Sequence, residues 1–473
     1  GVQTCALPIS DMNFTMIRNW VGQIGDKEFY EACDRHGIMV WQDFWLANPV
    51  DGPNPYYTEM FNANACDYLK RIRNHPSIGI YVGRNEGNPP AGIDDYLRGL
   101  VFREHPGLYY ISNSAMGVVS GGGPYRALSP KSYFQSYGHD KFHSERGMPN
   151  VMNYESMLLT FGTDKIEPVN TSETPNPVYG LHDYTLGGGK GSSAQAASSF
   201  NDMIEKAFGR PRDAKQFAEW AQWINYDGYR AIFEGRSEHR RGMLLWMSHS
   251  AWPSMVWQTY DYYFDPNAAY FGCKKASEPL HIQWNPLRDD IEVVNYHAFD
   301  RTGLTATASL FNQDGTLQWT RETKLDIKED QTVACFPLEQ PETLSDTYFI
   351  KLSLTDSDGK QLSDNFYWRG KEDGNYKSLL QLPKVSVCKN VTVKKTGKEW
   401  LIRAVLKNEA RTPALMLRLK VAGEKSGRML LPVFYSDNYF SLLPGEVKEV
   451  DIRLYDADTY GEKPVLEVLG FNL

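Results

Sequence analysis

The strongest constraint on this chain is a change of hydrophobic pattern near residue 279. Before it, short apolar runs such as Ile38–Phe44 and Ser77–Gly83 alternate with helical patterns. After it, apolar residues recur at every second position, as in Leu304–Leu310, which a turn at Asp314-Gly315 follows. Alternating strands and helices fold as a parallel sheet, whereas period two is typical of antiparallel strands with one buried face. The pattern predicts an α/β part followed by an all-β part.

The α/β part contains six short β-branched or aromatic runs that we expect to form strands buried on both faces. They are Asn13–Val21, Ile38–Phe44, Ser77–Gly83, Leu108–Asn113, Lys141–Glu145 and Met243–Met247. Helices are expected over Asp26–His36, which begins with acidic residues and stops at Gly37, and over Ala214–Glu238, which has an apolar stripe. These units fit a doubly wound sheet or a barrel, and the remaining length fits two β-sandwiches of about 100 residues each.

Composition excludes several classes of protein. The 473 residues include 50 Lys and Arg against 58 Asp and Glu, which gives a net charge of −8. There is no basic field for nucleic acid or an anionic membrane surface, and no apolar run reaches the roughly 18 residues of a membrane-spanning helix. The cysteines are widely spaced without a Cys-x-x-Cys pair, so neither a disulfide framework nor a zinc site is expected. Aromatic residues reach 13%, which suits large cores and stacking on sugar rings.

The first residues carry a different signal. Gly1–Ile9 matches the forward translation of a common sequencing adapter, so residues 1–10 are expected to be non-native. The chain has neither a starting Met nor the pattern of a signal peptide, and we expect a protein truncated at its N-terminus. Localisation is left open by the sequence, with a periplasmic or secreted protein suspected.

Two glutamates follow predicted strands directly. Glu86 ends the run Tyr81–Glu86 after Asn85, and Glu145 ends the run that begins at Phe142. In a β/α barrel the C-terminal strand ends face the active site, so two such carboxyl groups can converge on one pocket. Glycoside hydrolysis needs a carboxyl pair of this kind. The alternative is that each is a solvated loop residue or a helix cap.

Several motifs along the chain resemble glycoside hydrolase family 2, and the resemblance covers nearly the whole chain from Asp11. In the α/β part they are Met16–Gly22, Asp34–Phe44, Arg73–Ser77 and Gly83–Glu86. The segments most similar to the β-mannosidase and exo-β-glucosaminidase branch are Met243–Ser254, Tyr260–Tyr263 and Ala269–Lys275. In the all-β part the similarity continues through Glu278–Gln283, Ser436–Phe440 and Leu443–Glu446.

The resemblance implies an architecture of α/β plus all-β type. A (β/α)8 TIM barrel that lacks its first strand would occupy residues 11–279. Two immunoglobulin-like β-sandwich domains would follow, over residues 280–380 and 381–473. The spacing is unusual, because only 59 residues separate Glu86 from Glu145 and must hold two barrel units of normally about 30 residues or more. Those units must be abbreviated.

The resemblance also implies roles for individual residues. Glu86 would be the general acid/base and Glu145 the nucleophile of a retaining glycosidase, with Glu86 protonated and Glu145 ionised at the start. Asn85 would bind the sugar at its 2-position, and Arg18 would keep Glu145 charged. Further candidates for substrate contact are Trp20, Trp41, Asp43, Trp246, Trp252 and His182. For each Trp, core packing is the alternative, and His182 lines the pocket or caps a turn.

The expected activity is that of a retaining exo-β-glycosidase with a covalent glycosyl-enzyme intermediate. Gly83-Arg84-Asn85-Glu86 is the form of β-mannosidases and β-galactosidases, whereas glucosaminidases carry an Asp before the site that suits an ammonium group. A β-mannoside is therefore the first choice, with exo-β-D-glucosaminidase or β-galactosidase activity of the same family as the alternative. A non-catalytic carbohydrate-binding protein or an inactive fragment is the rival. No cofactor or metal is implied, the expected partner is a glycoside or oligosaccharide, and the oligomeric state and exo or endo action stay open.

Overall fold

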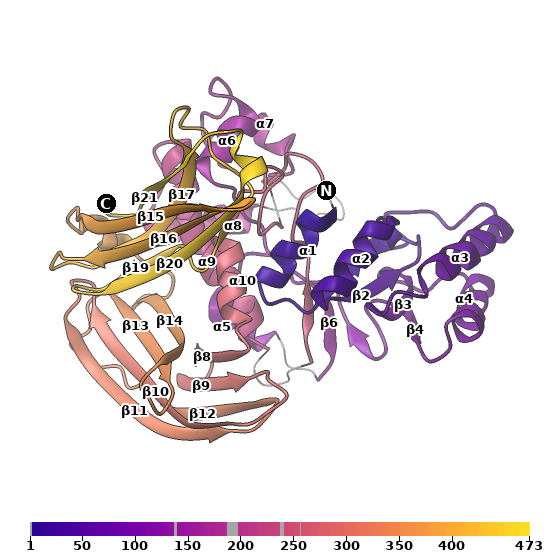
Figure 1. The fold of residues 1–473 in the computed structure, drawn as a ribbon, viewed down its shortest axis with the longest axis horizontal. Coiled ribbons are helices and arrows are strands. Elements are labelled where there is room, and N and C mark those ends of the chain that lie inside the picture. Colours follow the sequence, from indigo (N-terminus) through magenta and orange to yellow (C-terminus); the bar gives the residue numbers. More distant parts are fainter. Residues whose placement is uncertain (1, 137–139, 187–196, 237–240, 256) are drawn as a thin grey trace. The chain divides into compact units, whose positions relative to one another are not determined.

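The computed structural model describes residues 2–136, 140–186, 197–236, 241–255 and 257–473, coloured along the chain in Figure 1. The chain divides into two compact units. The first comprises Gly1–Pro124, His139–Arg146 and His239–Trp246. The second comprises Tyr125–Gly138, Gly147–Glu238 and Met247–Leu473.

Two parallel sheets form the described part of the first unit. The larger has the order β1 (Met16–Asn19), β2 (Met39–Asp43), β3 (Ile78–Arg84) and β4 (Tyr109–Asn113). The smaller has the order β5 (Val119–Ser120), β6 (Phe142–Arg146) and β7 (Met243–Leu245). The predicted strands are confirmed to within a few residues at each end, and all neighbours pair in parallel. No ladder joins the two sheets among the described residues, so the barrel stays a prediction.

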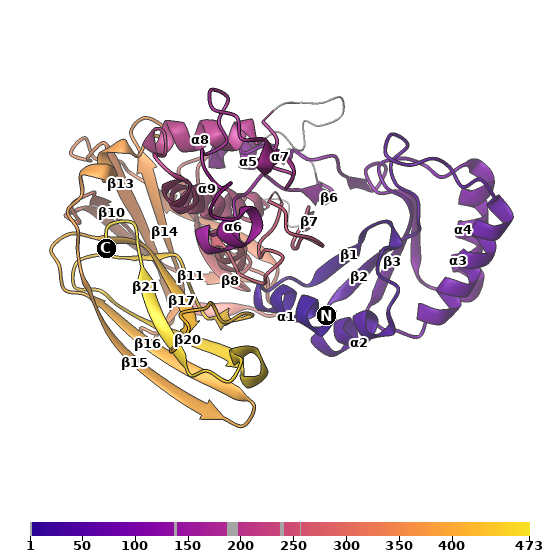
Figure 2. The ribbon, with the colours of Figure 1, turned by 90° about the horizontal axis from the view of Figure 1, so that it is seen from above.

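Helices accompany the larger sheet as β/α units. They are α1 (Val2–Asp11), α2 (Lys27–His36), α3 (Thr58–Ile72) and α4 (Ala91–Glu104), of which α2, α3 and α4 cover one side of the sheet in Figure 2. The prediction of α2 is confirmed, and Gly37 ends it at φ 65°, a left-handed conformation that glycine adopts without strain.

The helical part of the second unit is built around a long buried helix. Its elements are α5 (Pro130–Gln135), α6 (Tyr154–Phe161), α7 (Pro177–Gly180), α8 (Ser198–Phe208), α9 (Ala214–Glu234) and α10 (Ala268–Ala276). Helix α9 begins where predicted, because the Asp213 side chain accepts a hydrogen bond from the Gln216 N–H. It stops at Glu234, four residues earlier than expected, and residues 237–238 lie outside the described part.

Two β-sandwiches complete the second unit, as the period-two pattern predicts. The first consists of β8 (Leu280–Asn285), β9 (Asp290–Asn295), β10 (Arg301–Asn312), β11 (Leu317–Ile327), β12 (Gln331–Pro337), β13 (Thr347–Thr355) and β14 (Gln361–Gly370). The second consists of β15 (Val387–Thr396), β16 (Glu399–Asn408), β17 (Ala414–Gly423), β18 (Phe434–Tyr435), β19 (Phe440–Leu442), β20 (Val447–Tyr455) and β21 (Pro464–Leu469). Each pairs a four-stranded with a three-stranded antiparallel sheet.

Aromatic packing joins α9 to both sandwiches. The Trp223 ring lies 4.7 Å from that of Trp368 in β14 and 5.0 Å from that of Phe471 near the C-terminus. Both tryptophans are almost fully buried. Burying rings of this size contributes a large share of the apolar stabilisation of such an interface. Within the described ranges, the structure has no helix with the length and hydropathy needed to cross a membrane.

Candidate active site

Four strands of the first unit deliver the candidate catalytic side chains. Arg18 lies on β1, Asp43 ends β2, Asn85 and Glu86 directly follow β3, and Glu145 lies on β6. The strand register places Arg18 near Asp43, because Arg18 on β1 pairs with Trp41 on β2 and Trp41 lies two residues before Asp43. The C-terminal ends of parallel strands share one edge of a sheet, which is where α/β proteins place their active sites.

The Arg18 guanidinium joins these strands. Its Nη1 donates to Glu145 Oε1 at 2.6 Å and its Nη2 donates to Asn85 Oδ1 at 2.7 Å. Nε and Nη2 also donate to Asp43 Oδ2 at 3.0 and 2.7 Å. Only 5% of the Arg18 side chain is exposed, so solvent screens these contacts weakly. One guanidinium thus holds the nucleophile candidate next to the residue that precedes the acid/base candidate.

Asp43 is the anchor of this guanidinium. It is fully buried, and it also accepts hydrogen bonds from the Trp41 indole at 2.7 Å and the Val21 N–H at 3.0 Å. Burial by itself lowers the pKa of Arg18, but the charges of Asp43 and Glu145 outweigh it and raise that pKa. Because its oxygens bond the chain's own donors, Asp43 positions Arg18, and its contact with substrate stays a prediction.

Glu86 is presented differently from Glu145. Its backbone adopts φ 47°, an uncommon left-handed conformation for a residue with a side chain, and its N–H donates to Ser114 Oγ at 2.9 Å. Ser114 Oγ also lies 3.2 Å from Asn85 Oδ1, which fixes the turn. The Glu86 side chain is half-buried, and the described residues provide no hydrogen bond or ion pair to its carboxyl group. It is therefore available to a ligand.

A glycine segment after β5 runs beside both glutamates. A Cβ on Gly122, whose φ is 79°, would lie 3.6 Å from Glu86 Oε1, and the Gly123 N–H donates to the Glu145 carbonyl at 3.2 Å. At Gly121 a Cβ would lie 2.5 Å from Ser144 Oγ, too close for any side chain. The sequence analysis did not assign these glycines or Ser114 to the site, although three consecutive glycines are a signal for close backbone approach.

The candidate tryptophans of the first unit divide into two kinds. Trp41 is 2% exposed, stacks on Phe142 and lies 5.6 Å below the Arg18 guanidinium, so the structure supports its packing alternative. Trp20 and Trp246 are half-buried and form an edge-to-face pair at 5.0 Å. The Trp246 N–H donates to the Arg146 carbonyl at 2.8 Å, next to Glu145. Their contact with a sugar stays a prediction.

His182 and Trp252 belong to the second unit, where they contact each other. Their rings stack at 5.8 Å, and His182 Nδ1 is 2.7 Å from the Pro253 carbonyl. Asp183 has φ 68° and its N–H donates to the Gly180 carbonyl, so this segment forms the turn that follows α7. The turn alternative is thus present in the structure, and a role in substrate binding stays a prediction.

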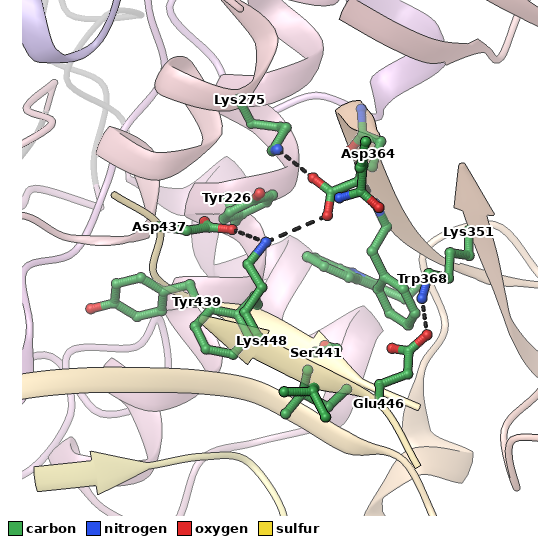
Figure 3. Close-up of a pocket in the computed structure, with 16 residues that line it drawn as sticks. Tyr226, Lys275, Lys351, Asp364, Trp368, Asp437, Tyr439, Ser441, Glu446 and Lys448 are labelled. Atoms are coloured by element: carbon green, nitrogen blue, oxygen red, sulfur yellow. Dashed lines mark hydrogen bonds and ion pairs between the residues drawn. The ribbon is translucent and has the colours of Figure 1, made fainter. Parts of the chain in front are cut away.

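The second unit also contains a cavity of about 180 Å3 between α9, α10, β14 and the second sandwich (Figure 3). Each of its lysines is paired with a carboxylate: Lys275 with Asp364 at 2.7 Å, Lys448 with Asp437 at 2.7 Å, and Lys351 with Glu446. With these charges neutralised, the cavity offers no clear selectivity for a charged ligand, and we interpret it as part of a domain interface. The described residues include no group of three or more His, Cys, Asp or Glu that could hold a metal ion.

Comparison with known proteins gives relatives along the whole chain. It is 26% identical to the mannosylglycoprotein endo-β-mannosidase of Lilium longiflorum, over 98% of this chain and 60% of that protein. It is 28% identical to the exo-β-D-glucosaminidase of Streptomyces avermitilis, over 95% of this chain and 55% of that protein. The chain thus spans little more than half the length of these curated relatives.

The fold is shared with solved structures of similar enzymes. The exo-chitosanase CsxA of Amycolatopsis orientalis superposes with a TM-score of 0.87 at 24% identity, over 99% of this chain and 61% of that one. The β-D-mannosidase of Dictyoglomus thermophilum gives a TM-score of 0.75 at 20% identity, over 100% of this chain and 58% of that one. Residues 365–473 match the family described as the exo-β-D-glucosaminidase Ig-fold domain. The chain is thus similar to β-mannosidases and exo-β-D-glucosaminidases, in agreement with the resemblance to glycoside hydrolase family 2 found in the sequence.

Proposed function

We propose that the chain carries the catalytic centre of a retaining exo-β-glycosidase, with a terminal β-mannoside as the preferred substrate. The observation that carries the proposal is the Arg18 guanidinium, which bonds both Glu145 and Asn85 and so brings the two strand ends with the glutamates together. We also propose that the two parallel sheets of the first unit are parts of one TIM-type barrel, since its strand ends face the active site in enzymes of this architecture.

The chemistry follows from the state of each carboxyl group. Glu145, ionised beside Arg18, attacks the anomeric carbon while protonated Glu86 gives its proton to the leaving glycosidic oxygen. The bond from carbon to that oxygen breaks, and an ester between the sugar and Glu145 forms. Glu86 then removes a proton from water, which attacks the same carbon and releases the sugar and the Glu145 carboxylate. Two inversions at one carbon give net retention.

Asn85 supports a hydroxyl, rather than an ammonium group, at the sugar 2-position. Its Oδ1 accepts from Arg18 and lies within hydrogen-bond distance of Ser114 Oγ, so its amide N–H groups are left to donate. The described residues offer no partner to Asn85 Nδ2. A hydroxyl oxygen accepts such a bond, whereas an ammonium group has only donors. This preference separates a mannoside from a glucosaminide.

Exo-β-D-glucosaminidase activity is the second candidate, because the match over residues 365–473 and several relatives carry that name. A panel of p-nitrophenyl β-mannoside, β-galactoside and β-glucosaminide decides between the sugars. We expect the mannoside to be hydrolysed fastest and hydrolysis to be lost in Glu145→Gln, while Glu28→Gln on the surface of α2 serves as the matched control. Full activity in Glu145→Gln excludes it as nucleophile, and sugar binding without turnover on any substrate supports the non-catalytic alternative.

A further inference from the structure

Two exposed tyrosines of the first unit lie side by side in the segment between β2 and α3. Tyr56 is 90% exposed and Tyr57 65% exposed, and their rings form an edge-to-face pair at 4.9 Å. Val50 in the same segment and Met60 in the first turn of α3 are also exposed. Single exposed apolar residues are ordinary, but a cluster that includes two aromatic rings marks a binding surface.

Topology places this segment on the same edge of the sheet as the catalytic residues. Tyr57 is the N-cap of α3, and this helix returns from the C-terminal end of β2 to the start of β3. Because β2 and β3 are parallel, α3 begins at the edge where both strands end. Tyr56 and Tyr57 therefore lie at the edge from which Asn85 and Glu86 extend.

Buried contacts hold the segment against that strand end. Arg84, the last residue of β3, is 3% exposed and donates to the Ala47 carbonyl at 2.7 Å and to Asn54 Oδ1 at 2.7 Å. The Asn85 N–H donates to the Leu46 carbonyl at 3.0 Å. Arg84 has no carboxylate partner among the described residues, so its guanidinium serves chiefly to fix this loop.

The loop also reaches the residue after the acid/base candidate. A Cβ on Gly87 would lie 3.0 Å from the ring of Pro49, so the two chain segments are in contact on the far side of Glu86. An acid that protonates the glycosidic oxygen lies on the side from which the leaving group departs. A surface that flanks Glu86 is thus placed to meet the leaving group.

We propose that Tyr56 and Tyr57 form an outer platform for the sugar residues on the leaving-group side of the scissile bond. The proposal rests on the proposed function, which defines the side of the active site on which the leaving group of the oligosaccharide lies. A tyrosine ring offers an apolar face to the C–H groups of a sugar and a hydroxyl at its edge, and the same loop carries amide and carboxylate groups at Asn48, Asp51 and Asn54. The occupant is a neutral oligosaccharide, because this loop provides no exposed cation for an acidic one.

The test compares substrates of different length. The double variant Tyr56→Ala/Tyr57→Ala is expected to lower the ratio of kcat/KM for β-1,4-mannotetraose to that for p-nitrophenyl β-mannoside by about tenfold. Tyr56→Phe/Tyr57→Phe restores most of the ratio, since stacking needs only the ring. Tyr109→Ala removes a tyrosine that is 62% exposed at the start of β4, on the opposite edge of the same sheet, and leaves the ratio unchanged. An unchanged ratio in the double alanine variant overturns the platform.

A binding experiment separates this proposal from the proposed function. Calorimetric titration with β-1,4-mannotetraose and with the β-1,4-glucosamine tetramer needs no turnover. If no aryl glycoside is hydrolysed but the double alanine variant binds a tetramer about tenfold more weakly, the platform stands and the proposed function fails. If the variant binds both tetramers like the parent, the platform is wrong. If it changes only the association state seen by size-exclusion chromatography, the surface contacts another polypeptide and the platform is also wrong.

Discussion

Each unit contains a buried cluster of arginine and carboxylate side chains, and the two clusters differ in their ratio of guanidinium to carboxylate groups. In the first unit a single guanidinium, Arg18, bonds two carboxylates, Asp43 and Glu145. In the second unit a single carboxylate, Asp227, bonds two guanidiniums, those of Arg230 at 2.8 Å and Arg369 at 3.0 Å. The formal charge of the first cluster is −1 and that of the second is +1.

The two clusters also differ in the groups that surround their charges. Around Arg230 the positive charge meets aromatic faces, with the guanidinium 3.9 Å from the Tyr367 ring and within hydrogen-bond distance of Asn365. The buried carboxylate of Glu234, which accepts hydrogen bonds from Tyr367 and Asn365, also raises the pKa of Arg230, so the positive charge is balanced within the core. Arg18 and its two carboxylates contact Asn85, the residue before Glu86, and the carboxyl group of Glu86 has no hydrogen bond or ion pair to the described residues. A negative surplus at a strand edge stabilises the positive charge that develops on a sugar ring in glycoside hydrolysis.

The largest effect on catalysis short of removing a glutamate is expected from Arg18→Met. The change leaves Asp43 and Glu145 buried without their cation and releases Asn85, so kcat/KM for the best aryl glycoside should fall about 10³-fold. Arg18→Lys keeps a positive charge, but an ammonium group cannot bond three partners in the geometry of a guanidinium. Its kcat/KM should lie between those of Arg18→Met and the parent. Steady-state kinetics on folded protein, checked by circular dichroism, measures this. Near-parental kcat/KM in Arg18→Met would show that the guanidinium is not needed.

Arg230→Met should change stability and spare the chemistry. It leaves Asp227 with one guanidinium and removes the contacts to Asn365 and Tyr367, which we expect to cost about 3 kcal/mol in the free energy of unfolding. Chemical denaturation gives that value, and aryl-glycoside kinetics below the transition should match the parent. A selective loss of kcat/KM in the folded variant would mean that the two clusters are not separate in function.

The buried carboxyl group of Asp261, which bonds no cation among the described residues, allows a test by pH. Burial and the neighbouring charge of Asp265 raise its pKa. The folded state then holds a proton that the unfolded chain releases near pH 4, so stability is lost as the pH rises above 4 toward the folded pKa. Asp261→Asn mimics the protonated form and should exceed the parent by about 1 to 2 kcal/mol at pH 8 while matching it at pH 4. Thermal melts at both pH values check this, and equal gains at both would refute the titration.

The smallest effect is expected at an exposed pair of the first unit. Arg241 and Asp140 form an ion pair at 2.6 Å with side chains that are 60% and 59% exposed. Arg241→Ala should change the free energy of unfolding by at most about 0.5 kcal/mol, because water and salt screen exposed pairs. It should leave kinetics unchanged. If Arg241→Ala lowered the free energy of unfolding as much as Arg230→Met, burial could not explain why the two arginines differ in their effect on stability.

The contrast also shows which features could be predicted from the sequence. The strands β2 and β3 lie in runs rich in apolar residues, and Glu86 and Glu145 were assigned to the site because they follow predicted strands. The roles of Arg18 and Asn85 were assigned from the resemblance to a family. The period-two pattern predicted both sandwiches. Local order in the sequence was enough to find these strands, and the ends of β1, β2 and β3 share an edge because they belong to one parallel sheet.

The features that were missed depend on contacts between distant segments. Ser114 reaches the Glu86 N–H from 28 residues away, and a lone serine gives no signal in a sequence. The substrate contact predicted for Asp43 stays a prediction, and the bonds that it makes with Arg18 and Trp41 appear only once the strands are paired. Strand β5 is two residues long, too short for any periodicity. Such roles follow from packing rather than from pattern.

Trapping the covalent intermediate tests the central claim most directly. A 2-deoxy-2-fluoro-β-mannoside with a dinitrophenyl leaving group slows release of the sugar more than its attachment, so the ester accumulates on the nucleophile. Peptide mass spectrometry after incubation should find one fluorosugar on the peptide that contains Glu145, and none in Glu145→Gln. A fluorosugar on another residue, or no adduct in a chain that hydrolyses the parent glycoside, would contradict the assignment of Glu145 and the retaining mechanism built on it.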